Sequence, residues 1–185
     1  MGANAASSIR FASNGTIYVA PVATAAPTDV ETALAATWKP LGYVDPAGVE
    51  MTPTVETSPV EAWQSAVPVT YLVTSASFTM KFILQQFDKE SVELYFGASF
   101  VAVPEETGVY QLDLSSSPAL AETAMVIEWS DATVKNRLVV PRASVSARDG
   151  LQLVRTSNQK LGVTMSALDS SGKLGWILTN AAVGA

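Results

Sequence analysis

The residue types that most often carry out chemistry are sparse in this chain. Its 185 residues include no His and no Cys, which excludes imidazole proton transfer, thiolate nucleophiles, thiolate metal ligands and disulfides. Glu105 and Glu106 are adjacent carboxyl groups, but neighbouring side chains on a loop point apart and make a poor acid/base pair. Gly172 and Lys173 lack the upstream glycine of a phosphate-binding loop. We therefore predict that the protein is not an enzyme and uses no cofactor or metal ion.

Tryptophan offers a second kind of candidate site. Trp38 and Trp63 could stack on a sugar ring, as in a carbohydrate-binding module. Trp side chains more often anchor a core or a protein interface. The residues alone leave both interpretations open.

The segment 50–63 has neither a helical nor a regular strand period and is rich in Pro, Thr and Glu. It carries Val55, Val60 and Trp63, which is too much apolar surface for a solvated linker. A connection of this length without secondary structure is usually functional or disordered. We therefore expect a long loop over residues 45–68 that becomes ordered against another copy of the chain.

The composition also favours self-association. Hydrophobic residues make up 48% of the chain and charged residues 15%, whereas about 25% charged residues is usual for a soluble domain. Residues 29–61 contain six acids and one base, and residues 131–173 contain seven bases and three acids. These are either solvated faces or complementary surfaces that recognise each other head to tail. The candidate basic face comprises Arg142, Arg148, Arg155 and Lys160.

The hydrophobic periodicity predicts a mainly β, antiparallel sandwich or barrel with one short flanking helix. Ala76, Phe78, Met80, Phe82 and Leu84 alternate with polar residues, as in a half-buried strand. The predicted helix covers 88–97, with Asp88 as N-cap and Gly97 as left-handed stop. Turn signals are expected at Asn14-Gly15 and Asp149-Gly150. The other predicted strands are 16–19, 38–44, 125–130, 134–140, 142–148, 151–155, 161–167 and 174–178.

We expect a single domain over 1–185, with an extended N-terminal arm at 1–14. No apolar run reaches the roughly 18–20 residues of a membrane span, and the N-terminus has no pattern of an export signal. The sequence therefore indicates no membrane partner. A nucleic-acid groove is disfavoured, because the chain is acidic and its bases are not interleaved with aromatic residues.

An ordered set of residues resembles a known family. The set comprises Trp38, Leu41-Gly42-Tyr43, Gly48-Val49, Glu56-Thr57, Glu61-Ala62-Trp63-Gln64 and Leu94-Tyr95-Phe96-Gly97. It resembles the major tail tube protein of long, non-contractile-tailed bacteriophages, particularly those that infect actinobacteria. The resemblance is most specific over residues 38–97, and the segment after Gln64 departs from it because residues 65–70 contain no basic residue where one is expected before the strand.

The resemblance implies six-copy rings that stack into a tube, with the long loop reaching a neighbouring ring. It implies homo-oligomer, tape measure and tail-end partners, DNA passing through the lumen without specific binding, and a location in the virion after assembly in the host cytoplasm. The expected loop contacts are Glu50, Glu56, Glu61, Trp63, Gln64 and Val67. The polar residues that we expect to line the lumen are Ser75, Ser77 and Thr79.

Other assignments stay open from the sequence. A capsid decoration protein or a head–tail joining protein would share the β composition and the self-association. A secretion-system tube protein would share the fold and the ring, although its loop motif differs from the pattern of residues 38–97.

Overall fold

The computed structural model describes residues 9–117 and 120–181. Residues 1–8 of the predicted arm 1–14 lie outside the described residues. The described part forms ten strands and one helix, in the order β1 (Asn14–Pro21), β2 (Lys39–Pro40), β3 (Val44–Val60), β4 (Thr70–Leu84), α1 (Lys89–Phe96), β5 (Phe100–Ala102), β6 (Tyr110–Leu112), β7 (Glu122–Asp131), β8 (Val134–Arg148), β9 (Leu161–Ala167) and β10 (Trp176–Thr179).

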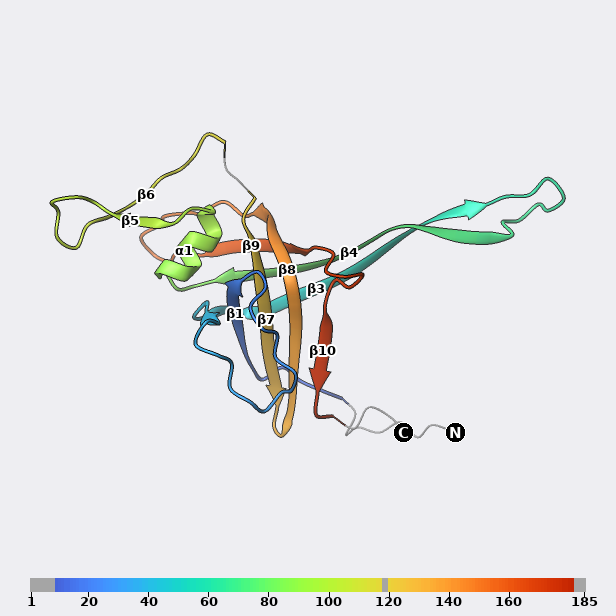
Figure 1. The fold of residues 1–185 in the computed structure, drawn as a ribbon, viewed down its shortest axis with the longest axis horizontal. Coiled ribbons are helices and arrows are strands. Elements are labelled where there is room, and N and C mark those ends of the chain that lie inside the picture. Colours follow the sequence, from blue (N-terminus) through green and yellow to red (C-terminus); the bar gives the residue numbers. More distant parts are fainter. Residues whose placement is uncertain (1–8, 118–119, 182–185) are drawn as a thin grey trace.

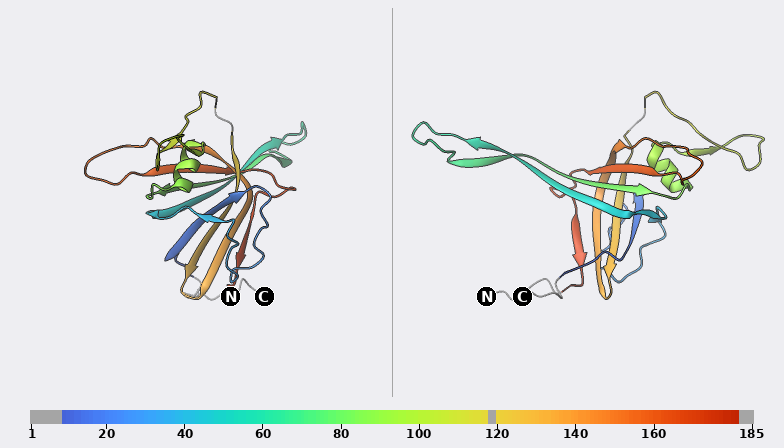
Figure 2. Two further views of the ribbon diagram at one scale, coloured as in Figure 1. Left: turned by 60° about the vertical axis from the view of Figure 1, so that its left-hand side comes forward. Right: turned by 180° about the vertical axis from the view of Figure 1, so that it is seen from behind.

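Eight of these strands form two layers that belong to one sheet, and β5 and β6 form a separate antiparallel pair. The order is β2-β1-β7-β8-β9-β4-β3, with β10 also paired to β8, and every pairing is antiparallel. Figure 1 and Figure 2 show β1, β7, β8 and β10 running across the direction of β9, β4 and β3. The sandwich form of the predicted fold class is confirmed, and the sheet does not close into a barrel.

The strand β8 connects the two layers. Its residues 136–139 pair with β10, and its residues 143–148 pair with β9 on that same side. Pro141 lies between the two pairings, where its missing N–H removes no bond to either partner. The predicted strands 134–140 and 142–148 are therefore one continuous strand that changes partner.

The main core lies between the two layers. Met80, Phe82 and Leu84 of β4 are buried there against Leu161, Val163 and Met165 of β9 and against β7 and β8. The alternation predicted for 76–84 is confirmed from Phe78 onward, but Ala76 is exposed.

A smaller second core lies on the other face of the β1-β7-β8 layer. Val126 and Val139 are buried there with Trp38, which the preceding loop brings over the sheet. Trp38 is 5% exposed, so it cannot present a stacking face to a sugar. Its proposed role in carbohydrate binding is wrong.

The helix has the predicted ends. The carboxylate of Asp88 accepts the Ser91 N–H at 2.9 Å, and Gly97 takes φ = 71° and donates its N–H to Glu93 O. Val92 and Tyr95 are buried. A helix of two turns is not stable alone, and this one is held by packing against β8 and β9.

Several local predictions were wrong. Asn14-Gly15 is not a turn but the start of β1, paired with Ser130 and Trp129. Within the predicted strand 38–44, only Lys39–Pro40, which form β2, and Val44, the first residue of β3, belong to strands.

The predicted hairpin at Asp149-Gly150 is also wrong. Residues 149–160, including the expected strand 151–155, form an irregular connection, and β8 pairs with β9 across it. Here tertiary pairing of the long flanking strands overrides a local turn signal.

The predicted loop 45–68 is the largest correction. Its first part is β3, a strand of 17 residues that pairs with β4 at Val44 and again from Val49 to Val60, so only residues 61–69 form a loop. No core lies on either side of the outer half of this strand, so neither face has to be uniformly hydrophobic and the segment shows no regular strand period.

Candidate assembly surface

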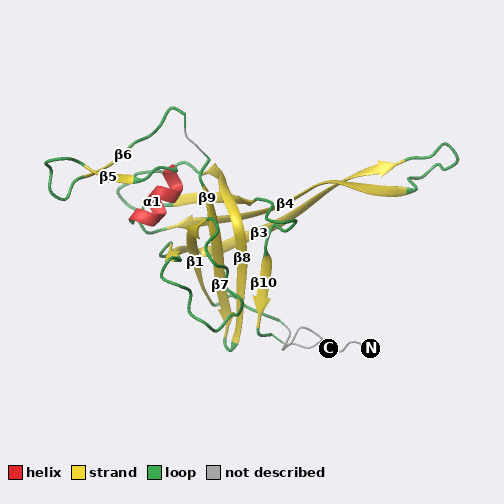
Figure 3. Ribbon diagram, in the orientation of Figure 1, coloured by secondary structure: helices red, strands yellow, loops and turns green. Residues whose placement is uncertain are grey.

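The most prominent surface feature is the outer half of the β3–β4 hairpin. The strand β9 pairs with β4 only over residues 79–84, so residues 53–60 and 70–78 form a two-stranded ribbon that leaves the body of the molecule. Figure 3 shows the ribbon extending to one side and ending in a loop. Its side chains are exposed on both faces except for the half-buried Phe78 at its base. A two-stranded ribbon is marginally stable in water by itself.

One face of the ribbon is polar in its inner part, from Thr52 to Glu56, whereas Val60 and Leu72 lie on this face nearer the tip. Directly opposite pairs on this face are Thr52 with Thr79, Thr54 with Ser77, and Glu56 with Ser75. The Ser75 hydroxyl donates to Glu56 Oε2 at 3.0 Å. The predicted lumen residues therefore lie on one face, with Ser75 and Ser77 exposed and Thr79 half-buried where β9 begins to pair.

The other face of the ribbon is apolar because of a β-bulge. Val55 lies opposite Ala76, but the next pair is Glu56 with Ser75 and then Thr57 with Val73, so Thr74 is an extra residue. The extra residue turns the rest of β4 over. Val73 and Tyr71 consequently share the face of Ala76 and Phe78 rather than the face of Ser75. The exposed fractions of Val55, Val73 and Tyr71 are 61%, 58% and 63%.

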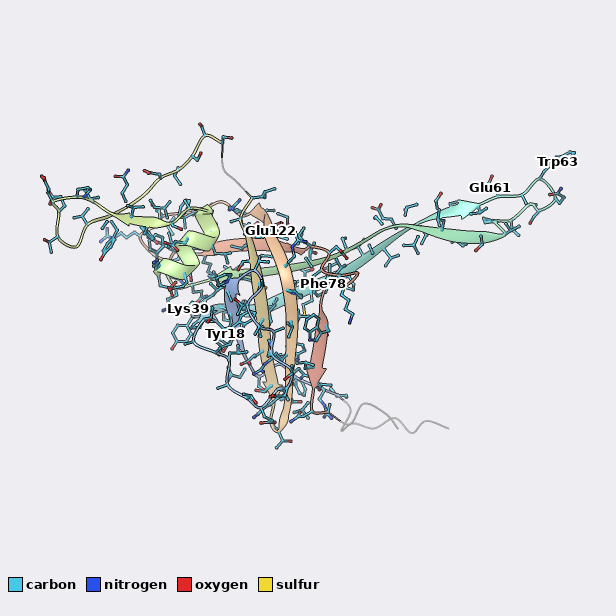
Figure 4. The ribbon with its side chains drawn as sticks, viewed as in Figure 1. Tyr18, Lys39, Glu61, Trp63, Phe78 and Glu122 are labelled. Atoms are coloured by element: carbon cyan, nitrogen blue, oxygen red, sulfur yellow. The ribbon has the colours of Figure 1, made fainter. Side chains whose placement is uncertain are left out.

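The tip of the ribbon presents Trp63. Its side chain is 99% exposed, and Figure 4 shows it at the far end of the ribbon, beyond Glu61, while Phe78 lies near the body. The tip loop is held by its own hydrogen bonds, from Ser65 N–H to Ala62 O at 3.0 Å and from the Ser65 hydroxyl to Val67 O at 2.7 Å. A large apolar ring held out on an ordered loop is suited to insertion into a partner.

The predicted loop contacts all lie on this hairpin. Glu50 and Glu56 are on β3, and Glu61, Trp63, Gln64 and Val67 are at the tip, and all of them are exposed. The prediction missed three exposed apolar residues of β4, namely Tyr71, Leu72 and Val73. Their high β propensity was visible, but the bulge that sets their faces depends on pairing with β3.

The four residues of the candidate basic face do not form one cluster. Arg142 forms two hydrogen bonds to the Glu122 carboxylate, at 2.9 and 2.8 Å, which lowers the pKa of Glu122. Lys160 binds Asp45 at 2.7 Å, and Arg148 donates to Tyr95 O. Arg155 lies exposed on the connection 149–160.

Arg148, Arg155 and Lys160 are placed at the opposite end of the molecule from the ribbon. Figure 1 shows the connection between β8 and β9 beside α1 and the β5–β6 pair, on the side away from the ribbon tip. Between Lys39 and Lys81 the chain has no basic residue, whereas it has Asp45, Glu50, Glu56 and Glu61. Asp45 binds Lys160 away from the ribbon, so the charged residues of the outer ribbon and its tip are Glu56 and Glu61, both acidic.

The carboxyl groups of a groove beside β1 are engaged in structural contacts. This groove, of about 930 Å³, lies between β1, β7 and the start of β3 and includes Asp45 and Glu128. Asp45 binds Lys160, and Glu128 binds Arg137 at 2.5 Å. Glu105 and Glu106 are exposed in the turn between β5 and β6. The arrangement supplies no free acid/base pair in this groove.

Residues 9–117 and 120–181 contain neither a group of metal-ligating side chains nor a helix of membrane-spanning length. In these ranges no group of three acidic residues could hold a metal ion. No helix described by the structure is long and apolar enough to cross a membrane.

A family model and solved structures match this chain. A chain in the structure titled "Virion of native gene transfer agent (GTA) particle" has a TM-score of 0.43 and 10% sequence identity, over 80% of this chain and 92% of that chain. A search of curated proteins gave no significant match. The family model described as phage tail tube protein matches residues 1–184. The chain therefore belongs to the phage tail tube protein family and is a structural protein of the virion.

Proposed function

We propose that the protein assembles into hexameric rings that stack into a tube through which DNA passes, and that it has no catalytic activity. The observation that carries this proposal is the ribbon of β3 and β4. It extends beyond the sandwich with an exposed apolar face and ends in Trp63. Contiguous exposed apolar patches usually mark interaction sites, so this surface supports association with another copy.

The direction of the ribbon supports stacking of rings. It extends from one end of the molecule, and the exposed Arg155 and Leu153 lie on the connection at the other end. A surface at one end that binds a different surface at the other end makes a heterologous contact, which repeats without closing. In this proposal the ribbon, with Glu56, Glu61 and Trp63, contacts the connection 149–160 of a copy in the next ring.

The polar face of the ribbon supports the assignment of the lumen. Ser75, Ser77 and Thr79, with Thr52 and Thr54 opposite, offer hydroxyl groups and no positive charge. The chain has a formal net charge of −6. Phosphates of a passing duplex are affected by charges within about 8 Å, the screening length at physiological salt. Lys81, the next residue of β4 on this face, is exposed and pairs with Asp149 at 3.4 Å. A wall of hydroxyl groups whose neighbouring cation is already paired does not hold DNA and lets it pass.

Electron microscopy of the purified protein over a concentration series tests the proposal. Hollow, straight tubes with six-fold rings and a regular axial repeat are the expected result. Rings of another symmetry would overturn the hexamer, and single rings that never stack would favour a head–tail joining or capsid decoration role. Addition of tail-end protein complexes as initiators provides a second arm, because tube growth can depend on nucleation.

A further inference from the structure

The connection 149–160 begins with a residue that is bonded on several sides. The Asp149 N–H donates to Gly162 O at 2.9 Å, and the Asp149 C=O accepts the Tyr95 hydroxyl at 2.5 Å. Its carboxylate pairs with Lys81 of β4 at 3.4 Å. Gly162 leaves room for that carboxylate, because a Cβ at this position would lie 2.5 Å from Asp149 Oδ2. The start of the connection is therefore held against α1, β9 and β4.

The end of the connection is held by the start of β3. The Lys160 ammonium pairs with the Asp45 carboxylate at 2.7 Å. Asp45 lies where the register between β3 and β4 shifts, and it also accepts the Ala47 N–H at 3.1 Å and the Gln85 side-chain amide at 2.9 Å. A carboxylate with three partners has little freedom to move. Lys160 is therefore tied to a fixed point at the base of the hairpin.

The middle of the connection has no such anchors. Residues 152–159 are exposed and form no hydrogen bond to a described residue outside the connection. Leu151, just before them, is half-buried against the main core. The position of residues 152–159 relative to the body of the molecule thus depends on the two ends of the connection.

The ribbon of a second copy complements the middle of the connection. Arg155 pairs with no carboxylate among the described residues. Leu153 and Val154 beside it are 71% and 50% exposed. The ribbon tip carries Glu61 close to Trp63, and both are exposed. Apolar surface and opposite charges would therefore meet in the same contact.

We propose that the ion pairs Asp149–Lys81 and Asp45–Lys160 fix the connection 149–160 relative to the ribbon of the same copy, so that a copy docked on the connection is aligned with that ribbon. This inference rests on the proposed function and names the residues that set the angle between successive copies. Lys81 and Asp45 belong to β4 and β3, the strands that continue outward as the ribbon. The receiving and the projecting surface of one copy are therefore joined by two short links.

The two ion pairs are suited to holding a loop rather than the fold. The side chains of Lys81 and Asp149 are 48% and 52% exposed, and that of Lys160 is 50% exposed. Loss of an ion pair with this exposure changes a population by at most about fivefold. Such a change is too small to unfold the subunit, but it is large enough to free a connection that has no other anchors in its middle.

Pulsed electron paramagnetic resonance on the dilute subunit tests the anchors. The chain has no Cys, so Ser77→Cys on the ribbon and Arg155→Cys on the connection place two spin labels at defined positions. In this background, Lys160→Met should broaden the distribution of distances between the labels, with displaced connections up to about fivefold more populated. Gly162→Ala should broaden it without any change of charge, because the new Cβ displaces the Asp149 carboxylate.

Lys135→Met is the matched control for the spin-label measurement. It removes a pair with Glu31 at 2.5 Å, and the Lys135 side chain is 47% exposed, close to the 50% of Lys160. This pair lies away from the connection, so the distribution should stay as in the wild type. Circular dichroism checks the folding of each variant. If Gly162→Ala does not fold, Lys160→Met still carries the test.

Electron microscopy of tubes assembled from the unlabelled variants tests the consequence. Tubes of Lys160→Met and Gly162→Ala should bend, and the rotation between their successive rings should vary more widely, whereas Lys135→Met should match the wild type. Unchanged distance distributions, straight tubes with the wild-type rotation, or an equal effect in the control would overturn the inference and leave the tube proposal in place. Wild-type protein that forms no tube at any concentration, with or without initiators, would overturn both.

Discussion

The two halves of β4 lie in different surroundings. Residues 79–84 run between β3 and β9, and Met80, Phe82 and Leu84 are buried in the main core. Residues 70–78 pair with β3 alone among the strands of the described ranges, and their side chains are exposed except for Phe78. The inner half of this strand stabilises the fold, and its outer half is available for association. The inner half provides the rigid base that the outer half needs, because a ribbon of two strands is marginal alone.

The largest change in stability is expected from a substitution in the inner half of β4. Phe82→Ala should lower the free energy of unfolding by about 3–5 kcal/mol, because it leaves a cavity in the core. Tyr71→Ala, in the outer half of the same strand, should change it by less than about 0.5 kcal/mol. Denaturant unfolding of the dilute subunit measures both. A large loss of stability in the Tyr71 variant would place the outer half in the core and contradict the comparison.

Trp63→Ala, at the tip of the ribbon, should weaken association without changing the core around the inner half of β4. The subunit should keep its stability, because Trp63 makes no core contact at 99% exposure. Assembly should need at least about thirtyfold more protein, as for the loss of an interface hot spot of about 2 kcal/mol. Light scattering reports assembly, and circular dichroism reports folding. Trp38→Ala is the control, because this buried Trp should destabilise the subunit instead. An unfolded Trp63 variant would show that the tip belongs to the fold.

Charge reversal sharpens the comparison between the two ends of the molecule. Glu56→Lys with Glu61→Lys should slow the initial rate of assembly about tenfold at low salt, because charge complementarity acts mainly on association rates. The effect should shrink as salt is added. Glu105→Lys with Glu106→Lys changes the charge equally but in the turn between β5 and β6, on the side of the proposed receiving connection, and should not slow assembly. Stopped-flow scattering that shows equal rates for all variants would refute electrostatic docking of the ribbon.

The smallest expected effect concerns the base of β3. Lys160, with the Ala47 N–H and the Gln85 amide, lowers the pKa of Asp45 from its ordinary value of 3.8 to about 2. A lowered pKa in the folded state contributes stability above pH 3.8, and this contribution is lost as the pH falls through about 2. The difference in unfolding free energy between wild type and Asp45→Asn should therefore shrink between pH 5 and pH 2. A constant difference over this range would show that Asp45 is not tied to Lys160 in solution.

The sequence by itself determined the features that depend on neighbouring residues. The helix needs a cap and a stop within one short segment, and Asp88 and Gly97 supply both. The alternation from Phe78 to Leu84 is visible because one face of that strand meets a core. The motif set of residues 38–97 was sufficient to indicate the tail tube family, which the match over residues 1–184 confirms.

Only the tertiary structure decided the features that depend on a distant partner. Residues 49–60 form a strand because β4 supplies their hydrogen bonds, and a strand that is exposed on both faces has no local hydrophobic period to predict it. The face of Val73 depends on the bulge at Thr74, which exists only in the register with β3. The signal at Asp149-Gly150 was overridden because β8 and β9 pair across a longer connection. Pairing between strands is a long-range property, and its register is set by both strands together.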